Sequence, residues 1–394
     1  MESVVVNTLL FIIALIIYSF KRRKIDCGFI LLATYAFIAV LNFALYTAEP
    51  SEWHLRLWPF IYLFVICMMF FRPFFFDSDK LFERLKKPNM KVLSAFCIIY
   101  IVCSLVSIYY GLDSAMQNIV SGKFNEAYFD NSAGDVALYT NQFERLAKIF
   151  AQYFQPVAML TVFYYLTLKN FKPLRIILLA LAVILPTLVS SIIIGNRSMI
   201  VQFLILITIC YFIFHRGIPK KRKRIIMIPS VILIILVFFL LSTVTISRFG
   251  EEKVTSSVFF YLGHSMLTFN YGVTDTIHTY SNGKYFFSWF IDAFGGNSKI
   301  DILKLGAHFD GAFSTIVGPL YMDFGPIGTF IIAVIAPAFL SLFFWPKKQI
   351  DMANIYMYAF SLNHITYGAL VVSSGTALIW MMAFIIYGVL KIFK

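Results

Sequence analysis

Long apolar runs alternate with short polar stretches along most of the chain. An α-helix rises 1.5 Å per residue, so about 20 apolar residues are needed to cross the hydrocarbon core of a bilayer. The runs close to that length predict about 11 transmembrane helices. We expect these helices at about residues 4–20, 27–46, 57–76, 92–110, 147–168, 176–194, 199–214, 225–246, 327–345, 356–372 and 376–390.

Two polar stretches are much longer than the others. They cover about residues 111–146 and 247–312, and each joins two apolar runs. The chain has no internal repeat that would indicate paired halves. The predicted fold is therefore an all-α polytopic membrane protein, built as a single integral membrane domain over residues 1–394 with two long loops.

The composition excludes an ordinary soluble protein. Hydrophobic residues make up 60% of the chain and charged residues only 13%, and the mean hydropathy is +0.80. Soluble globular domains are closer to half apolar and about a quarter charged. The five cysteines lie within or at the ends of apolar runs without CxxC spacing, so we expect them to pack in the core rather than to bind zinc.

The distribution of positive charge orients the predicted helices. If the chain starts outside, every short basic stretch falls on the cytoplasmic side, where such stretches are favoured. These stretches hold 22 of the 33 Lys and Arg residues: 21–24, 80–91, 169–175, 216–224, 347–348, and Lys391 with Lys394. We therefore expect the N-terminus and both long loops outside and the C-terminus inside. The net charge of +13 then reflects anchoring near anionic lipid, and no nucleic acid partner is expected.

Two arginines stand out at the predicted outer ends of the helices. Arg197 lies in the turn GNRS between two apolar runs, and Arg248 follows the run at 225–246. The planar guanidinium group has five donors that suit a phosphate or a pyrophosphate. An arginine at a membrane interface is also commonly an anchor. Both interpretations stay open, although two arginines at one depth suit an anionic headgroup better than one.

A second group of candidate residues lies close to the end of the second long loop. His308 and Asp310 lie between glycines in GAHFDGAF, and Asp323 and Tyr321 follow in GPLYMDFGPIG. Titratable groups this close together are candidates for acid–base chemistry or for binding hydroxyl groups. A lone loop histidine is more often structural. No HExxH or similar spacing is present, so we expect no metal.

Two further features concern the ends of apolar runs. The density of glycine and proline in GPLYMDFGPIG argues against one continuous helix, and broken backbone at membrane depth requires protein or a water-filled cavity around it. We expect Asp323 to face such a cavity rather than lipid. Arg145, at the entry to the run at 147–168, suits either a sugar contact or a solvated helix end.

The GNR turn, the large outer loop and the closing GPLYMDFGPIG segment resemble the oligosaccharide repeat-unit polymerases of the O-antigen (Wzy) class. The resemblance covers most of the chain in architecture but only two short patches in residues. It implies a GT-C-like helical glycosyltransferase in the bacterial inner membrane that needs neither a metal nor another cofactor. The implied substrate is a polyprenyl-pyrophosphate-linked oligosaccharide, with membrane lipid and a chain-length regulator as further candidate partners.

The resemblance also implies roles for individual residues. Arg197 and Arg248 would hold the leaving pyrophosphate and stabilise its negative charge. His308, with Asp310 or Asp323, would orient or deprotonate the acceptor hydroxyl, which attacks the anomeric carbon with inversion. Tyr321 and Arg145 remain candidate sugar contacts.

Two other functions remain open. A related O-antigen ligase would transfer a finished glycan once to a different lipid, whereas a polymerase gives a ladder of chain lengths. A polysaccharide flippase or other transporter would be expected to show paired halves.

Overall fold

The computed structural model describes residues 1–48, 54–122, 124, 141–170, 172–224, 262–277, 279–300, 314–344 and 349–392. These residues are helical apart from turns and one isolated β-bridge between Leu85 and Ile350. They group into two compact units, which are described separately below. The first unit comprises Met1–Ser78, Val258–Lys347 and Ser361–Ile385, and the second comprises Asp79–Ser257, Lys348–Phe360 and Ile386–Lys394.

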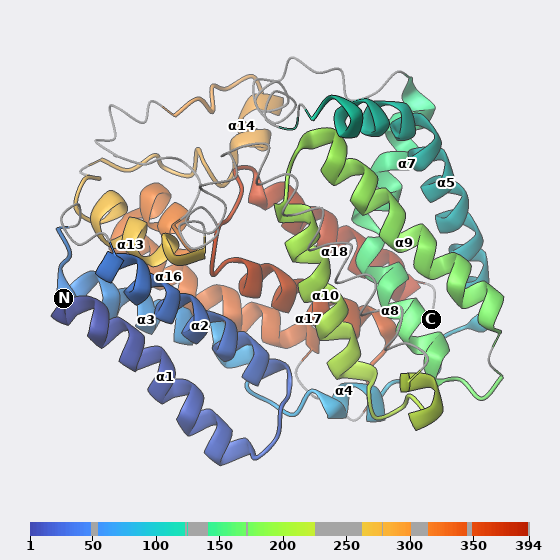
Figure 1. Ribbon diagram of the computed structural model, residues 1–394, viewed down its shortest axis with the longest axis horizontal. Coiled ribbons are helices and arrows are strands. Elements are labelled where there is room, and N and C mark those ends of the chain that lie inside the picture. The colour runs from blue at the N-terminus through green and yellow to red at the C-terminus, as the bar shows by residue number, and fades with distance from the viewer. Residues whose placement is uncertain are drawn as a thin grey trace. The chain divides into compact units, whose positions relative to one another are not determined.

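The first unit contains helices from both ends of the chain (Figure 1). Helix α1 packs against α2 and α3, and α16 packs against α3 although more than 200 residues separate them in the sequence. The long helices are α1 (Glu2–Arg22), α2 (Cys27–Ala48), α3 (Leu57–Phe71), α16 (Val317–Phe344), and parts of α17 (Met352–Tyr367) and α18 (Thr376–Ile392). Short elements η2 (Arg72–Phe74), α13 (Ser265–Leu267), the π-helical turn η4 (Thr268–Val273) and α14 (Ser288–Ala293) connect them.

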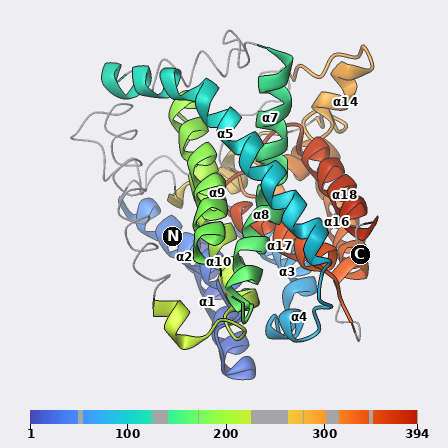
Figure 2. The same ribbon diagram turned by 90° about the vertical axis from the view of Figure 1, so that its right-hand side faces the viewer.

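The second unit is built around the contact between α5 and α9, which run side by side (Figure 2). Asn89 begins α5 by accepting hydrogen bonds from the backbone N–H groups of Lys91 and Val92, and Gly122 ends it with φ 66°. Such caps supply partners for the end groups that a helix leaves unpaired. The helices of this unit are α4 (Asp79–Glu83), α5 (Met90–Ser121), α7 (Gln142–Tyr153), α8 (Gln155–Thr167), α9 (Pro173–Ile194) and α10 (Ser198–Phe214).

The described helices confirm the prediction of many apolar helices long enough to cross a membrane. Six meet the requirements of length and apolar composition, and a seventh span results if the bent pair α7 and α8 counts as one. Helices α10 and α18 are apolar but have 17 residues each, at the short end of the range of roughly 17–25 for a span. The predicted run at 225–246 lies outside the described residues.

The predicted span at 147–168 is wrong in one respect, because it is two helices rather than one. Helices α7 and α8 meet at a bend of 54° between Tyr153 and Gln155. Pro156 occupies the first turn of α8, where it has no N–H group to continue the ladder from α7. A proline at the start of a helix is favourable, so the sequence begins a new helix here.

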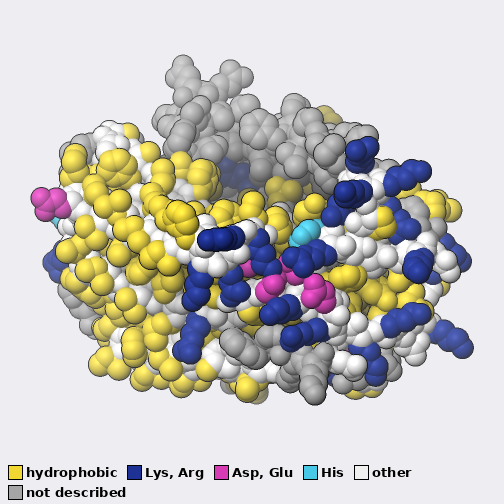
Figure 3. All heavy atoms as spheres, turned by 90° about the horizontal axis from the view of Figure 1, so that it is seen from below, with side chains coloured by type: hydrophobic (Ala, Val, Ile, Leu, Met, Phe, Trp, Pro, Cys, Tyr) yellow, Lys and Arg dark blue, Asp and Glu magenta, His cyan; other side chains and the backbone are white. Residues whose placement is uncertain are grey.

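Basic residues of the stretches predicted to be cytoplasmic form polar contacts within each unit. In the first unit, Lys24 forms an ion pair with Asp77, which joins the connection after α1 to the one after α3. In the second unit, Arg222 donates to the carbonyl oxygen of Leu166 at 2.9 Å, and Arg216 pairs with Asp79 at 2.7 Å. Figure 3 shows many Lys and Arg side chains in dark blue among hydrophobic ones.

Candidate functional site

Helix α16 carries the segment GPLYMDFGPIG and is broken within it, as the glycine and proline content predicts. The helix begins at Val317 and is interrupted at Gly325, whose φ of 68° and ψ of −177° are not helical. Pro326 follows and starts the second part of the helix. The Tyr62 hydroxyl donates to the Pro326 carbonyl oxygen at 2.6 Å. A side chain of α3 therefore supports the backbone at the break.

Glycine is required at the break for two reasons. Its positive φ lies in a region that L side chains rarely adopt. A Cβ atom added to Gly325 would also lie 2.8 Å from two ring atoms of Tyr280. The Tyr280 ring therefore lies so close to the backbone of α16 that residue 325 has no room for a side chain.

Asp323 fixes that segment to α16. Its side chain is buried, and its carboxylate accepts hydrogen bonds from the backbone N–H groups of Tyr285 at 3.1 Å and Phe286 at 2.7 Å, and from the Ser281 hydroxyl. The Asp323 carbonyl oxygen accepts a further bond from the N–H of Asn282 at 3.0 Å. The expectation that Asp323 faces a cavity is therefore wrong. The carboxylate faces backbone donors, which satisfy it within the protein.

The loop that Asp323 holds is also tied to the residues just before α18. The N–H of Gly375 donates to the Tyr285 carbonyl oxygen at 2.9 Å, and the Tyr285 hydroxyl donates to the Val372 carbonyl oxygen at the same distance. Burial, and to a smaller extent the charge of Asp323, raise the pKa of the Tyr285 hydroxyl to about 12. The hydroxyl therefore stays protonated and remains a donor across the physiological range.

Tyr321 lies inside an aromatic cluster one helical turn before the break. Its ring makes edge-on contacts with Tyr62, Phe269 and Tyr280, at centroid distances of 6.0, 6.0 and 6.2 Å. Only 5% of the residue is exposed. Tyr321 thus packs three separate segments together, which is an apolar role that its position in the sequence did not reveal.

His264 is a further candidate, which the sequence analysis did not single out. It is buried, its Nδ1 atom lies within hydrogen-bond distance of the Thr268 hydroxyl, and its Nε2 atom lies 3.4 Å from the Tyr271 hydroxyl. Thr268 and Tyr271 belong to a π-helical turn, a geometry that occurs frequently at functional sites. The signal was present in the sequence, because positions i, i+4 and i+7 share one face of a helix.

The polar side chain of Asn270 connects the same turn to the start of α3. Its amide accepts from the N–H of Arg56 at 3.0 Å and donates to the Arg56 carbonyl oxygen at 2.7 Å. The Arg56 guanidinium group also pairs with Asp275 at 2.5 Å and is largely exposed. Polar groups from three parts of the first unit are therefore arranged at one end of its helices.

Arg197 belongs to the second unit and lies in the tight turn that was expected between α9 and α10. Gly195 ends α9 with φ 64°, and Asn196 Oδ1 accepts from the N–H of Ser198 at 2.8 Å. Arg197 is half-buried immediately before α10. Arg145 is exposed on the first turn of α7. The predicted site residues Arg248, His308 and Asp310 lie outside the described residues.

Within the described part of the chain, no group of three or more His, Cys, Asp or Glu side chains is arranged to hold a metal ion. All five cysteines are free thiols. The polar groups in the described part of the site are histidine, tyrosine, asparagine, arginine, aspartate, serine and threonine side chains and backbone donors.

The described residues thus define an all-helical chain with several apolar helices long enough to cross a membrane and a polar, hydrogen-bonded end on its first unit. No family model, curated protein or solved structure matches the chain.

Proposed function

We propose that the protein polymerises polyprenyl-pyrophosphate-linked oligosaccharide repeat units into a surface polysaccharide such as O-antigen or capsule. The reaction is an inverting, metal-independent glycosyl transfer at the outer face of the bacterial inner membrane, on a GT-C-like arrangement of about 11 helices. The N-terminus lies outside and the C-terminus in the cytoplasm.

The observation that carries this proposal is the construction of the GPLYMDFGPIG segment, which also carries the resemblance to the polymerase class. In this segment Gly325 breaks α16, and Asp323 binds the backbone of residues 281–287. Such a broken, internally satisfied backbone is tolerated at membrane depth where it borders protein or a cavity. A lipid-linked substrate needs this combination, because its tail stays among apolar helices while its glycan reaches polar groups.

The proposed chemistry divides the roles among the candidate residues. The acceptor hydroxyl oxygen attacks the anomeric carbon, the bond from that carbon to the pyrophosphate oxygen breaks, and the hydroxyl proton passes to His308 or Asp310. The guanidinium groups of Arg197 and Arg248 bind the departing diphosphate and stabilise the charge that develops on it. Asp323 acts as a positioning residue, since its carboxylate already accepts three hydrogen bonds.

Substitution of the two arginines tests the proposed diphosphate site. In cells that lack the chromosomal gene, Arg197→Ala and Arg248→Ala should abolish chain extension while the protein remains inserted. Arg197→Lys should also be impaired, because a point charge does not reproduce two parallel hydrogen bonds. Arg224→Ala, at an exposed arginine of a predicted cytoplasmic stretch, is the matched control and should support normal chain lengths. Wild-type polymer lengths in both alanine variants would refute the diphosphate site.

The products separate this function from the two alternatives. A polymerase supplied with lipid-linked single repeat units gives a ladder of carrier-linked lengths, whereas a ligase gives a single transfer to a different lipid, and a transporter gives no new glycosidic bond. The predicted topology is tested independently with reporter fusions. Fusions at Asp113 and Lys253 should report the outside and one at Lys221 the cytoplasm, and a reversal at any of the three would contradict the proposed orientation.

A further inference from the structure

The second unit has a basic cleft that the proposed glycosyl transfer does not use. It has a volume of about 910 Å³ and lies where the connection before α5, the end of α8 and the beginning of α9 come together. Its lining includes five positively charged residues and no carboxylate. The charged residues are Lys87, Lys91, Lys169, Lys172 and Arg175.

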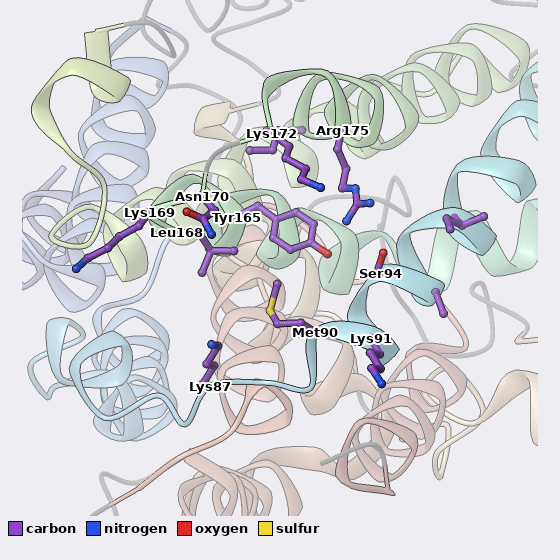
Figure 4. Close-up of a pocket in the computed structure, with 13 residues that line it drawn as sticks. Lys87, Met90, Lys91, Ser94, Tyr165, Leu168, Lys169, Asn170, Lys172 and Arg175 are labelled. Carbon is purple, nitrogen blue, oxygen red and sulfur yellow. The ribbon is translucent and has the colours of Figure 1, made fainter.

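Three of these cations face the cleft from opposite walls. Figure 4 shows Lys172 and Arg175 extending from the beginning of α9 toward Tyr165, and Lys87 pointing into the cleft from the connection before α5. Ser94 and Asn170 add neutral polar groups to the lining. The beginning of α9 has no side-chain cap, so the positive end of its helix dipole also favours an anion here.

The cations of this cleft differ from other cations of the same unit. Arg216 pairs with Asp79 at 2.7 Å and with Glu83 at 3.2 Å, and Lys391 pairs with Asp351 at 2.6 Å. Between the cleft cations and the carboxylates in the described ranges, no ion pair is formed. Five like charges around one cleft repel each other, so an anionic ligand would lower the free energy of this arrangement.

The rest of the lining identifies the chemistry of that anion. Met90, Ile98, Leu168 and Ile176 also line the cleft, so that most of its surface is apolar. Both α5 and α9 are long and apolar enough to cross a membrane, and the cleft lies at their basic ends. A soluble anion would gain nothing from the apolar wall, whereas a membrane lipid would place its phosphate among the cations and its acyl chains against that wall.

We propose that this cleft binds an anionic phospholipid, with cardiolipin or phosphatidylglycerol as the headgroup class, from the leaflet that faces the basic connections. Basic pockets between transmembrane helices on this side of a membrane suit such headgroups. The site is separate from the proposed diphosphate site, and its occupancy does not depend on the protein being a polymerase.

Native mass spectrometry of the purified full-length protein tests the site. Binding is measured for cardiolipin, phosphatidylglycerol and phosphatidylethanolamine, and separately for inorganic phosphate. The variant Lys87→Gln/Lys172→Gln/Arg175→Gln removes the three cations that face the cleft. Its matched control, Lys220→Gln/Lys221→Gln/Arg224→Gln, removes three exposed charges from another basic stretch that does not line the cleft.

Wild type and control should retain cardiolipin, and the cleft variant should bind it on the order of 100-fold more weakly, because each basic residue near an anionic surface contributes roughly fivefold. The charge-preserving variant Lys87→Arg/Lys172→Arg/Arg175→Lys should bind cardiolipin as tightly as wild type. Weak binding by this variant would overturn the proposal even if the glutamine variant fails to insert. Equal cardiolipin affinity in wild type and cleft variant would overturn the proposal. So would equal binding of phosphatidylethanolamine, or binding of inorganic phosphate as tight as that of cardiolipin.

Discussion

The charged groups at the polar end of the first unit and those in the basic cleft of the second unit have different surroundings. Asp323 is buried, and three donors from residues 281–286 satisfy its carboxylate. The cleft cations Lys172 and Arg175 are exposed and meet no carboxylate partner in the ranges that the structure describes. A buried charge is tolerated only with hydrogen-bonding or charged partners, whereas water can solvate an exposed charge that has no such partner. The difference separates a group that builds the site from groups that remain available to a ligand.

The largest effect is expected from removing the buried carboxylate. Asp323→Ala leaves two backbone N–H groups and the Ser281 hydroxyl without their acceptor, at a cost of roughly 3–6 kcal/mol in folding free energy. The melting temperature of the detergent-solubilised protein should fall steeply. Asp113→Ala, at an exposed carboxylate of α5, is the control and should leave the melting temperature nearly unchanged. Equal melting temperatures for the two variants would show that Asp323 does not hold residues 281–287.

A smaller loss is expected at the break in α16. Gly325→Ala places a methyl group against the Tyr280 ring and leaves an alanine at a positive φ. Together these should lower the folding stability by about 1–3 kcal/mol. The variant should also lower glycan extension, because the break orients the segment around Asp323. As a control, Gly388→Ala adds a methyl group to a helix position with nothing within 4 Å, and should stabilise by about 1 kcal/mol. A stabilising Gly325→Ala would contradict the close approach of Tyr280.

The smallest effect is expected from the exposed ion pair near the same end. Arg56→Ala removes the pairing with Asp275, which should cost less than about 1 kcal/mol because the guanidinium group is largely solvated. Asn270→Ala removes the two hydrogen bonds that this buried side chain makes to the Arg56 backbone, and should lower the melting temperature more. The reverse order would mean that the exposed pair, rather than the buried amide, holds η4 against α3.

Apolar periodicity and charge predicted most of the described helices because the bilayer imposes a simple rule on length and composition. The predicted run at 176–194 corresponds to α9 at Pro173–Ile194, and the one at 27–46 to α2 at Cys27–Ala48. The bend between α7 and α8 was missed because the apolar positions of the amphipathic helix α7 lead directly into the apolar helix α8, and only Pro156 marks the division. Helix α16 begins ten residues before the predicted start because Gly318 and Pro319 fit its first turn, and the break comes only at Gly325.

The candidate site was harder to predict because its contacts join residues that are distant in sequence. The glycine and proline density indicated the break in α16 correctly, but nothing local to Asp323 indicated that its partners lie at residues 281–286. The sequence predicted Tyr321 as a sugar contact. In the structure its ring packs against Tyr62 and Phe269 in an aromatic cluster. His264 could be found from the sequence only through its helical spacing to Thr268 and Tyr271, and these residues lie in a short segment flanked by glycines.

The length of the surface glycan in cells lacking this gene tests the central claim most directly. A polymerase predicts that only single-repeat glycan remains on the surface, and that wild-type chain lengths return when the intact gene is restored. A ligase predicts instead that long chains persist on the polyprenyl carrier and are missing from the final acceptor. Unchanged long chains on the surface of the deletion strain would contradict the account.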